Sequence, residues 1–318
     1  MRKLSDVLKE RNAELISTYR RVEAGEVIEL PYVPTGLPSL DAVGLLEKGI
    51  LTAIAGHPGD GKSALALQLL KAASEYGYSP VGFFFEDPLK FIADRVTASS
   101  TGESAFRLRR YQVEDIVERL EAVAGKEEWT EHVKIDDELK NSKQLIEWID
   151  KNVTEETGLV IVDYAQSLDS EDDEKSVERV IARLAWGLNQ LAKKKNIAIV
   201  LFSQVKKEVS DRGKLWFKDW CWKNNGQEPK ASDLDCVEGY RPLSNDMQWS
   251  TALQQRSKQI VFIFRPGSWM RSHGIVCNDD EMQMVIAKGN YGSANELLRF
   301  HWYGPTTTIS ERKRKGSK

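Results

Sequence analysis

The sequence has no long hydrophobic run and only three cysteines. No apolar stretch approaches the roughly 20 residues that a membrane-spanning helix needs, and the charged start, residues 1–21, has no signal-peptide core. We therefore expect a cytosolic protein without a membrane partner. Cys221, Cys236 and Cys277 are odd in number and include no close pair of metal ligands, which disfavours a disulfide framework and a zinc site. We expect all three to be free thiols.

A strong charge of either sign is also absent, since the formal net charge is −3. This balance argues against indiscriminate nucleic-acid binding, although a basic channel can exist in a protein that is acidic overall. With 41% hydrophobic and 29% charged residues, the composition is that of an ordinary globular protein. A chain of 318 residues can bury a substantial core, in one large α/β domain or in two small ones.

A phosphate-binding loop is the most specific motif in the chain. Residues 56–63 match GxxxxGK[ST] and lie between an apolar strand pattern and an amphipathic helix pattern, as this motif requires. Backbone amides of the loop can surround phosphates, Lys62 can neutralise β and γ oxygens, and the Ser63 hydroxyl can hold Mg²⁺. We therefore expect ATP and Mg²⁺ to bind here. The residues expected to contact the nucleotide are Gly56, His57, Pro58, Gly59, Asp60, Gly61, Lys62, Ser63 and Ala64.

Carboxylates follow two further apolar strand patterns. Asp163 ends the run 159–162, which is the Walker B form, and would reach Mg²⁺ through water. Glu86 and Asp87 follow residues 83–85, in the strand after the phosphate-loop helix. Because the carboxyl ends of parallel strands meet at one edge of a sheet, we expect these carboxylates to face one crevice. We predict that Glu86 is the general base and that Asp87 caps the next helix.

A polar pair ends another apolar strand pattern. Ser203 and Gln204 follow the run 199–202. The neutral amide of Gln204 can sense the γ-phosphate and pass its state to the loop that follows. A capped strand end explains the same pattern equally well.

The order of these patterns predicts an α/β fold, a RecA-like P-loop NTPase core whose mostly parallel sheet has helices on both faces. Apolar residues at near-helical spacing predict an N-terminal helix over residues 4–27. We expect a linker helix (1–30), an ATPase domain (31–310) and a basic, disordered tail (311–318). The expected strands are 50–55, 81–85, 159–162, 197–202, 259–264 and 282–287. The expected helices are 63–76, 89–99, 113–124, 142–153 and 174–194.

One segment has little periodicity. Residues 211–239 carry Trp216, Trp220 and Trp222 among lysines, and we expect them to form a long loop or a small inserted subdomain. Packing within that subdomain is the simpler use of the tryptophans, and stacking on nucleic-acid bases is the alternative. The acidic run 169–174 is expected to begin the helix that follows it.

Taken together, these motifs resemble the ATPase domain of DnaB-type replicative helicases, superfamily 4. The likeness runs from about residue 35 to residue 309. Its longest matching stretches are TGLPSLDA, FFFED, LVIVDYAQSL, LFSQVKKEVSDR, RPLSNDMQWSTALQQRSKQIVFIFR and MVIAKGNYGS. This combination separates the family from recombinases and from clock-type ATPases, which share fewer of these motifs.

The resemblance implies a role for each matching residue. The phosphate loop would bind nucleotide and Mg²⁺, Glu86 would be the catalytic base, Asp163 the Walker B carboxylate and Gln204 the coupling glutamine. Residues 246–251 look like the family's DNA-facing loop, which contacts the phosphate backbone of a single strand in the pore of a ring. The residues expected to contact DNA are Gln248, Trp249, Ser250 and Thr251, and the first two stand where the family more often has a basic and an acidic residue.

The chain departs from the family near its end. The family usually has a lysine there and, two residues later, an arginine finger that acts on the ATP of the neighbouring subunit. Here the residues are Lys288 and Asn290. Lys288 can still supply a cation, but an asparagine cannot neutralise γ-phosphate charge. Either Arg299 or another arginine compensates, or hydrolysis is slow.

The resemblance also implies a homo-oligomeric ring, expected to be a hexamer, that moves 5′ to 3′ on single-stranded DNA and unwinds duplex DNA. The N-terminal helix would dock on the adjacent subunit, and a primase or a helicase loader would be a further partner. The family's separate primase-binding domain is not matched, and compact chains of this form resemble helicases of phages or plasmids, which work in the cytosol of a bacterium or of the phage's host. Two alternatives stay open, namely a recombination or repair ATPase that forms filaments on DNA, and an ATP-binding replication assembly protein with little turnover.

Overall fold

The computed structural model describes residues 3–112, 116–123, 127–139, 141–163, 177–248, 250–289 and 294–312. The chain forms two compact units, residues 1–31 and residues 32–318. The first unit contains the helix α1 (Leu4–Glu23), in which no residue is buried. Its apolar side chains are therefore open to solvent within this chain, among them Leu4, Leu8, Ile16 and Tyr19.

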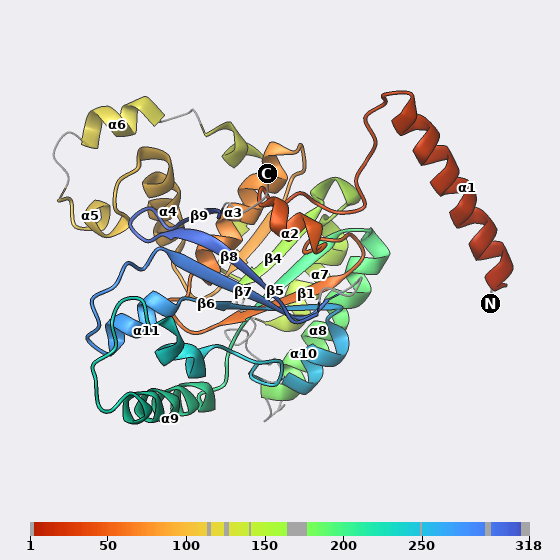
Figure 1. The fold of residues 1–318 in the computed structure, drawn as a ribbon. Helices are drawn as coiled ribbons and strands as arrows, with labels where there is room; N and C mark the ends of the chain where they lie inside the picture. The colour runs from red at the N-terminus through yellow and green to blue at the C-terminus, as the bar shows by residue number, and fades with distance from the viewer. Residues whose placement is uncertain are drawn as a thin grey trace. The chain divides into compact units, whose positions relative to one another are not determined.

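The second unit is built on a large twisted sheet (Figure 1). Over the described residues the sheet has nine strands, in the order β3-β2-β4-β5-β1-β6-β7-β8-β9. The strands from β3 to β6 in this order pair in parallel, and β7, β8 and β9 extend the sheet in antiparallel fashion. The strands are β1 (Leu51–Gly56), β2 (Val81–Phe84), β3 (Lys134–Asp136), β4 (Leu159–Asp163), β5 (Ala198–Gln204), β6 (Gln259–Phe264), β7 (Glu281–Lys288), β8 (Glu296–Tyr303) and β9 (Thr308–Glu311).

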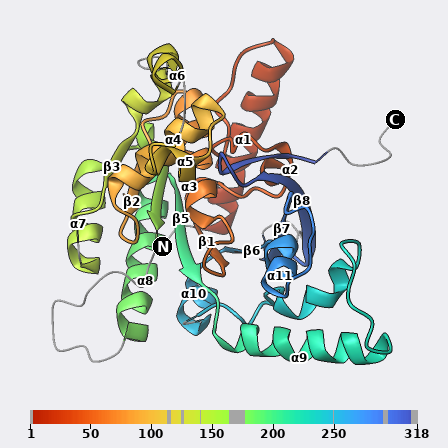
Figure 2. The same cartoon turned by 90° about the vertical axis from the view of Figure 1, so that its left-hand side faces the viewer.

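Helices connect these strands on both sides of the sheet (Figure 2). The α-helices of this unit are α2 (Pro38–Ala42), α3 (Lys62–Glu75), α4 (Leu89–Thr101), α5 (Ala105–Arg109), α6 (Ile116–Val123), α7 (Ser142–Asn152), α8 (Val177–Lys195), α9 (Glu208–Lys223), α10 (Ser250–Arg256) and α11 (Pro266–Ser272). The 3-10 helices are η1 (Glu128–His132), η2 (Glu155–Thr157) and η4 (Leu234–Tyr240).

The side chains of β4 alternate between the two faces of the sheet, and each face has its own core. Leu159 and Ile161 belong to a core with α2, α3 and α4, whereas Val160 and Val162 belong to a second core with α7 and α8. Successive strand residues point to opposite faces, so a strand that is apolar throughout must be covered on both. The predicted α/β architecture, a mostly parallel sheet between two helical layers, is confirmed.

The expected elements agree closely with the structure. All six expected strands are present, as β1, β2, β4, β5, β6 and β7, with ends that differ by at most two residues. The expected helices correspond to α3, α4, α6, α7 and α8, and the N-terminal helix to α1. Residues 113–115, 124, 169–176 and 313–318, which carry the ends of two expected helices, the acidic run and most of the tail, lie outside the described residues.

The segment 211–239 is more regular than expected. Most of its first half belongs to the helix α9, and η4 packs against that helix. A third small core contains Cys236, Tyr240 and Phe264, with Phe217 and Trp220 packed against it. The expectation of a long loop is wrong; the segment forms a small inserted subdomain that shares its core with Phe264 of β6 and Met270 of α11. The three cysteines are free thiols, as expected.

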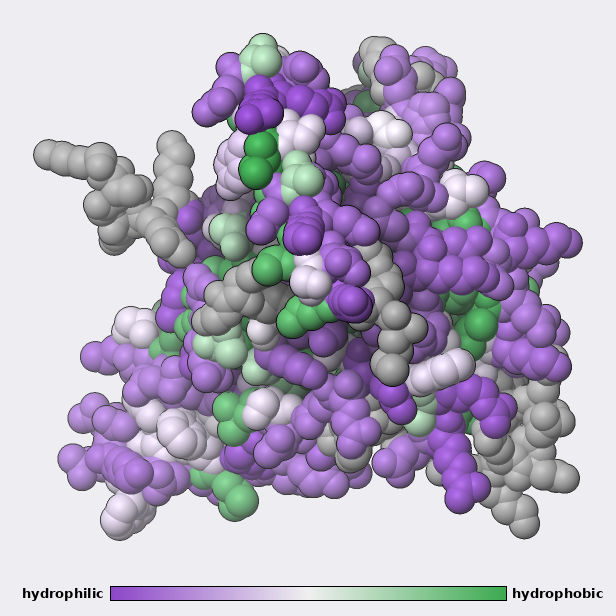
Figure 3. All heavy atoms as spheres, turned by 90° about the vertical axis from the view of Figure 1, so that its right-hand side faces the viewer, coloured by the Kyte–Doolittle hydropathy of each residue, from purple (hydrophilic) through white to green (hydrophobic). Residues whose placement is uncertain are grey.

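The tryptophans of this segment divide into two groups. The indole nitrogens of Trp216 and Trp220 donate to the Asp235 carbonyl and carboxylate, at 2.8 and 2.9 Å, so both are held within the subdomain. Trp222 is 78% exposed. The face drawn in Figure 3 is mostly hydrophilic, with small separate hydrophobic patches. In the described part of the chain, no helix is both long and apolar enough to cross a membrane.

Candidate active site

The phosphate loop connects β1 to α3, as its motif predicts. Gly59 and Gly61 have φ values of +82° and +97°, which favour glycine, and a Cβ on Gly61 would lie 2.7 Å from the Met282 Cε atom. Lys62 is buried, and its Nζ atom donates to the carbonyls of Gly56 at 3.2 Å and His57 at 3.1 Å. The loop is thus folded around the lysine amine, at the N-terminus of a helix where anions bind.

Burial lowers the pKa of Lys62, and the carboxylates of Asp163, Asp60 and Glu86 act in the opposite direction. A phosphate beside this amine would also favour its charged form. The lysine is therefore placed between a carboxylate cluster and the loop that would hold the phosphates.

A cavity of about 350 Å³ opens beside the loop. Its wall contains residues of the phosphate loop and of the segment after β2. Arg265, which follows β6, Trp302 of β8 and Thr307, which precedes β9, complete the wall. The lining residues are Pro58, Gly59, Gly61, Lys62, Ser63, Ala64, Glu86, Asp87, Arg95, Arg265, Trp302 and Thr307. Of the residues expected to contact nucleotide, Gly56, His57 and Asp60 lie behind this surface; His57 and Asp60 are buried.

Asp163 lies at the end of β4 and is 2% exposed. Its carboxylate accepts a hydrogen bond from Ser63, and burial raises its pKa to about 6. Its Oδ1 atom has no hydrogen-bond partner among the described residues. A buried carboxylate oxygen without a partner, beside a serine hydroxyl, fits the oxygen ligands of Mg²⁺. Because the described residues include no group of three or more His, Cys, Asp and Glu side chains arranged to hold a metal ion, the remaining ligands would be phosphate and water.

Glu86 and Asp87 follow β2 next to this metal-type site. The Phe85 amide donates to the Asp163 carbonyl at 2.8 Å, which holds the start of this segment against β4. Glu86 lines the cavity, as predicted. Asp87 does not cap the next helix, because the N-cap of α4 is Pro88 and Asp87 forms an ion pair with Arg95 at 2.6 Å. Arg95 lies six residues after the start of α4, and its ion pair with Asp87 holds the carboxylate away from the N-terminus of the helix.

Gln204 ends β5 and pairs with Gly56 across the sheet, so it lies beside the phosphate loop. Its carbonyl accepts the backbone N–H of Gln248 at 2.9 Å. The predicted DNA-facing loop is therefore joined by backbone hydrogen bonding to the strand end that carries Gln204. Trp249 lies outside the described residues, and Ser250 and Thr251 are in the first turn of α10.

Lys288 lies at the opposite end of the sheet from the phosphate loop. It pairs with Ile260 near the start of β6, and its amine donates to the carbonyls of Gln254 and Ser257 at 2.6 and 2.8 Å. Arg299 pairs with Gln283, five residues before Lys288 on β7, and forms an ion pair with Glu281. Arg299 is thus about 17 Å along the strand from Lys288, so it is not placed to replace a finger beside that lysine. Asn290 lies outside the described residues.

Arg265 lines the cavity and was not among the residues expected from the sequence. Arg265 follows β6, donates to the Gly59 carbonyl at 2.7 Å and lies 4.4 Å from the Trp302 ring centre, so it helps to hold the phosphate loop in place. The only signal was an arginine directly after an apolar strand. Asp60 is buried in the loop, and burial raises its pKa to about 7.

His57 joins the loop to the inserted subdomain. Its Nε2 atom lies 3.1 Å from the Tyr240 carbonyl, and its ring meets that of Trp269 edge-on, with centres 4.8 Å apart. Burial lowers the pKa of His57 to about 4, so the ring is neutral at neutral pH. The Nε2 atom must then carry the proton that the carbonyl accepts.

A phosphate loop after the first strand of a parallel sheet, with a carboxylate at the end of β4, defines a RecA-like P-loop ATPase fold. Residues 32–218, more than half of the chain, match the family model of the DnaB-like helicase C-terminal domain, and the chain belongs to this family. The match includes the phosphate loop, Glu86, Asp163 and Gln204.

Curated relatives agree with this assignment. The chain is 30% identical over 277 residues to a "Probable plasmid replicative DNA helicase" of Chlamydia trachomatis, covering 84% of this chain and 52% of the relative. It is 31% identical over 254 residues to the "Replicative DNA helicase DnaB" of Rhodothermus marinus, covering 75% of this chain and 24% of the relative. The chain thus spans about half the length of the plasmid relative and a quarter of the other.

Solved structures share the fold. One structure, described as an ATPase domain, superposes with a TM-score of 0.74 at 18% identity, over 95% of this chain and 98% of that one. A DnaB-like replicative helicase, described with its interactions with primase, gives 0.73 at 19% identity, over 94% and 68% of the two chains. The RadB recombinase gives only 0.54 at 16% identity, over 88% of this chain and 100% of that one.

Proposed function

We propose that this chain is an ATP-dependent replicative DNA helicase that forms a ring around single-stranded DNA. The observation that carries the proposal is the cavity that brings Lys62, Ser63 and Glu86 together beside Oδ1 of Asp163, which is buried and has no hydrogen-bond partner in the described part of the chain. Membership of the DnaB-like family and the names of its relatives support DNA unwinding as the use of this hydrolysis.

In the proposed reaction, the loop amides and Lys62 hold the β- and γ-phosphates of ATP. Ser63 and Asp163 would hold Mg²⁺, which supplies positive charge to the phosphate oxygens. Glu86 accepts a proton from the attacking water, whose oxygen forms a bond to the γ-phosphorus as the bond to the β-phosphate oxygen breaks. ADP and phosphate are released.

Movement on DNA would follow from the attachment of the DNA-facing loop. Gln204 would respond to the γ-phosphate, and its carbonyl holds the amide of Gln248. Gln248, Trp249, Ser250 and Thr251 would contact the backbone of a single strand, with the 5′ to 3′ direction expected from the family.

Self-association is part of the proposal, because two features of the chain are incomplete alone. α1 exposes Leu4, Leu8, Ile16 and Tyr19, which a second copy of the chain would cover, as the family's linker helix implies. Lys288 lies too far from its own phosphate loop and would act on the ATP of a neighbour. A hexamer follows the family pattern. A primase is a candidate further partner, since a similar structure was described with one.

The deciding experiment measures ATP hydrolysis with and without single-stranded DNA, in wild type and in Lys62→Ala, followed by unwinding of a forked duplex. We expect hydrolysis that DNA stimulates, that Lys62→Ala abolishes and that unwinding accompanies. ATP and DNA binding without turnover would contradict the helicase and favour an assembly protein. Stimulated hydrolysis without unwinding would favour a recombination-type ATPase.

A second experiment tests the ring. Removal of residues 1–31, which form a separate compact unit, should leave the ATPase unit folded but monomeric in sedimentation. A ring that persists without these residues would contradict the role of α1.

A further inference from the structure

Three consecutive carbonyls at the end of η4 are held by two different parts of the chain. The Arg212 guanidinium donates through Nε to the Gly239 carbonyl at 3.0 Å and through Nη2 to the Arg241 carbonyl at 2.8 Å. The carbonyl between them, that of Tyr240, lies 3.1 Å from Nε2 of His57 in the phosphate loop. Arg212 therefore holds the peptide segment whose Tyr240 carbonyl contacts His57.

The packing around Tyr240 leaves this segment little freedom to move alone. Its ring is 1% exposed and stacks on Trp269 with centres 4.0 Å apart, and its hydroxyl lies 2.8 Å from Nε2 of His273. α9 approaches so closely that a Cβ on Gly213 would lie 2.2 Å from the Tyr240 ring. Close-packed contacts of this kind transmit a displacement instead of absorbing it.

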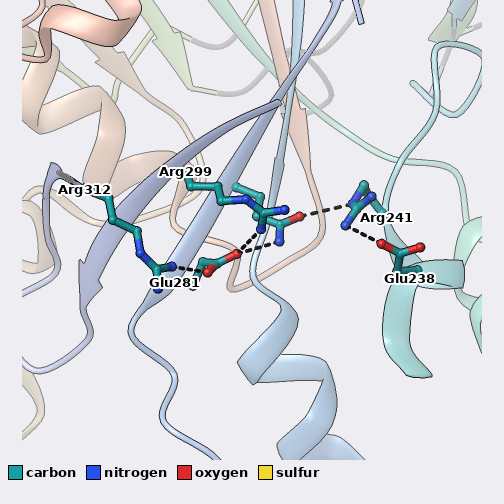
Figure 4. A network of polar contacts seen from close by, with 6 residues as sticks. Glu238, Arg241, Glu281, Arg299 and Arg312 are labelled. Atoms are coloured by element: carbon teal, nitrogen blue, oxygen red, sulfur yellow. Dashed lines mark hydrogen bonds and ion pairs between the residues drawn. The ribbon is translucent and has the colours of Figure 1, made fainter. Parts of the chain in front are cut away.

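The segment is also anchored to the sheet through side chains. Arg241 donates to Glu238 at 2.9 Å and to Oε1 of Gln283 at 3.1 Å, and Gln283 donates to Glu281 at 2.7 Å (Figure 4). Arg299 and Arg312 complete this network from β8 and from the residue after β9, and both bind Glu281. The η4 segment is thus tied to β7 of the sheet as well as to the phosphate loop.

The third nitrogen of Arg212 reaches the predicted DNA-facing loop. Its Nη1 atom lies 2.8 Å from Oδ2 of Asp246, and the Asp246 carbonyl accepts the Lys206 amide at 2.8 Å. Two residues later, the Gln248 amide bonds to Gln204. One guanidinium, a rigid planar fork, therefore contacts both the segment under His57 and the first residue of the DNA-facing loop.

We propose that Arg212 is a positioning residue that, with His57, couples the phosphate loop to the DNA-facing loop through the carbonyls of residues 239–241. The proposal rests on the proposed function and deepens it. When nucleotide reshapes the phosphate loop, His57 shifts the Tyr240 peptide, and Arg212 passes this displacement to Asp246. DNA held by residues 248–251 acts on the phosphate loop by the same route in reverse, since coupling between two sites is reciprocal.

The test is the ratio of DNA-stimulated to basal ATP hydrolysis in Arg212→Lys. A lysine keeps the charge and can still pair with Asp246, but it cannot hold two carbonyls and a carboxylate in one plane. We expect basal hydrolysis close to that of wild type and a fall in the stimulation ratio of about fivefold or more. Lys218→Gln on the same helix is the matched control, because Lys218 is exposed and its substitution removes a charge while the contacts of Arg212 stay in place.

A double-mutant cycle with His57→Phe tests whether the two residues act together, with each ratio normalised to the basal rate of its own variant. The double variant should lose no more stimulation than Arg212→Lys alone. An unchanged ratio in Arg212→Lys, an equal loss in Lys218→Gln or additive losses in the double variant would each overturn the proposal.

Hydrogen exchange at the Gln248 amide separates this proposal from the proposed function, because it needs no DNA. Adding ATP with Mg²⁺ should change exchange there in wild type and change it less in Arg212→Lys, in which only the link through the Gln204 carbonyl is left. If DNA fails to stimulate wild-type hydrolysis, the proposed function is contradicted while this measurement still decides the coupling. The same ATP-induced change in both proteins would refute it.

Discussion

Lys62 and Lys288 lie at opposite ends of the same sheet. Lys62 follows the carboxyl end of β1, whereas Lys288 pairs with Ile260, and Ile260 in turn pairs with Ala53, three residues before Gly56. The Lys288 amine is bound to carbonyls of the segment before β6 and so points away from the phosphate loop. Within one chain, Lys288 therefore cannot reach the phosphates that Lys62 would bind.

This relationship predicts that Lys288 acts between subunits. Lys288→Ala should lower DNA-stimulated hydrolysis by about tenfold or more, because a cation on the developing phosphate charge is lost. Lys258→Ala, which removes an exposed cation at the same end of the sheet, is the control. Mixing the Lys62→Ala and Lys288→Ala proteins should give more activity than either protein alone, since some interfaces then combine an intact loop with an intact lysine. No recovery on mixing would contradict action in trans.

Glu86→Gln tests the general base. The amide fills the same space in the cavity but cannot accept the proton of the attacking water, so kcat should fall by about a hundredfold or more. ATP affinity should change little, because the loop and Lys62 are intact. Glu75 is at the C-terminal end of α3, away from the phosphate loop, so the control variant Glu75→Gln should behave as wild type. If binding and turnover fall together in Glu86→Gln, the residue serves binding instead of proton transfer.

Asp163→Asn tests the metal role. Its buried Oδ1 has no partner among the described residues, and an amide is a weaker Mg²⁺ ligand than a carboxylate. The Mg²⁺ concentration that gives half-maximal hydrolysis should rise by about tenfold or more. Burial raises the pKa of Asp163 to about 6, and protons compete with metal, so the Mg²⁺ requirement of wild type should also rise as pH falls from 7 to 5. A requirement independent of pH would place the metal elsewhere.

The central strands were predictable because burial on both faces demands unbroken apolar runs, as in 159–162. The polar residue that ends each run could be identified from its position, which is how Asp163 and Gln204 were found. β3 was not predictable, since Lys134–Asp136 has three residues and none is buried. β8 carries a strand pattern, because the buried residues Leu298, Phe300 and Trp302 alternate with exposed ones.

Side-chain contacts that follow no helix or strand periodicity explain what the sequence could not reveal. α9 carries Gly213 in its interior, which opposes helix formation, yet that glycine is where Tyr240 packs. Asp87 precedes a helix and fits a cap, but the contact with Arg95 determines its position. Arg265 contacts Gly59 across 206 positions of sequence, a separation at which periodicity has no information.

Asp60→Asn should change the pH dependence of stability without nucleotide. Burial raises the Asp60 pKa from 3.8 to about 7, so the folded state holds its proton more tightly than the unfolded state. The stabilisation is full below pH 3.8 and is lost as pH rises to about 7. The asparagine still accepts the His57 amide but has no proton to lose. Its melting temperature, relative to wild type, should therefore rise between about pH 4 and pH 7 and then level off. A constant difference would contradict the raised pKa.

The tryptophans of the inserted subdomain should differ in their effect on stability. Trp220 packs against the small core and donates to Asp235, so Trp220→Ala removes apolar contacts and leaves a carboxylate without its donor. We expect a loss of about 2 kcal/mol or more in the free energy of unfolding. Trp222 is 78% exposed, and Trp222→Ala should change this free energy by less than about 0.5 kcal/mol. Denaturant unfolding of both variants measures the difference. Equal destabilisation would mean that Trp222 is covered in solution, by a second copy or by another part of the chain.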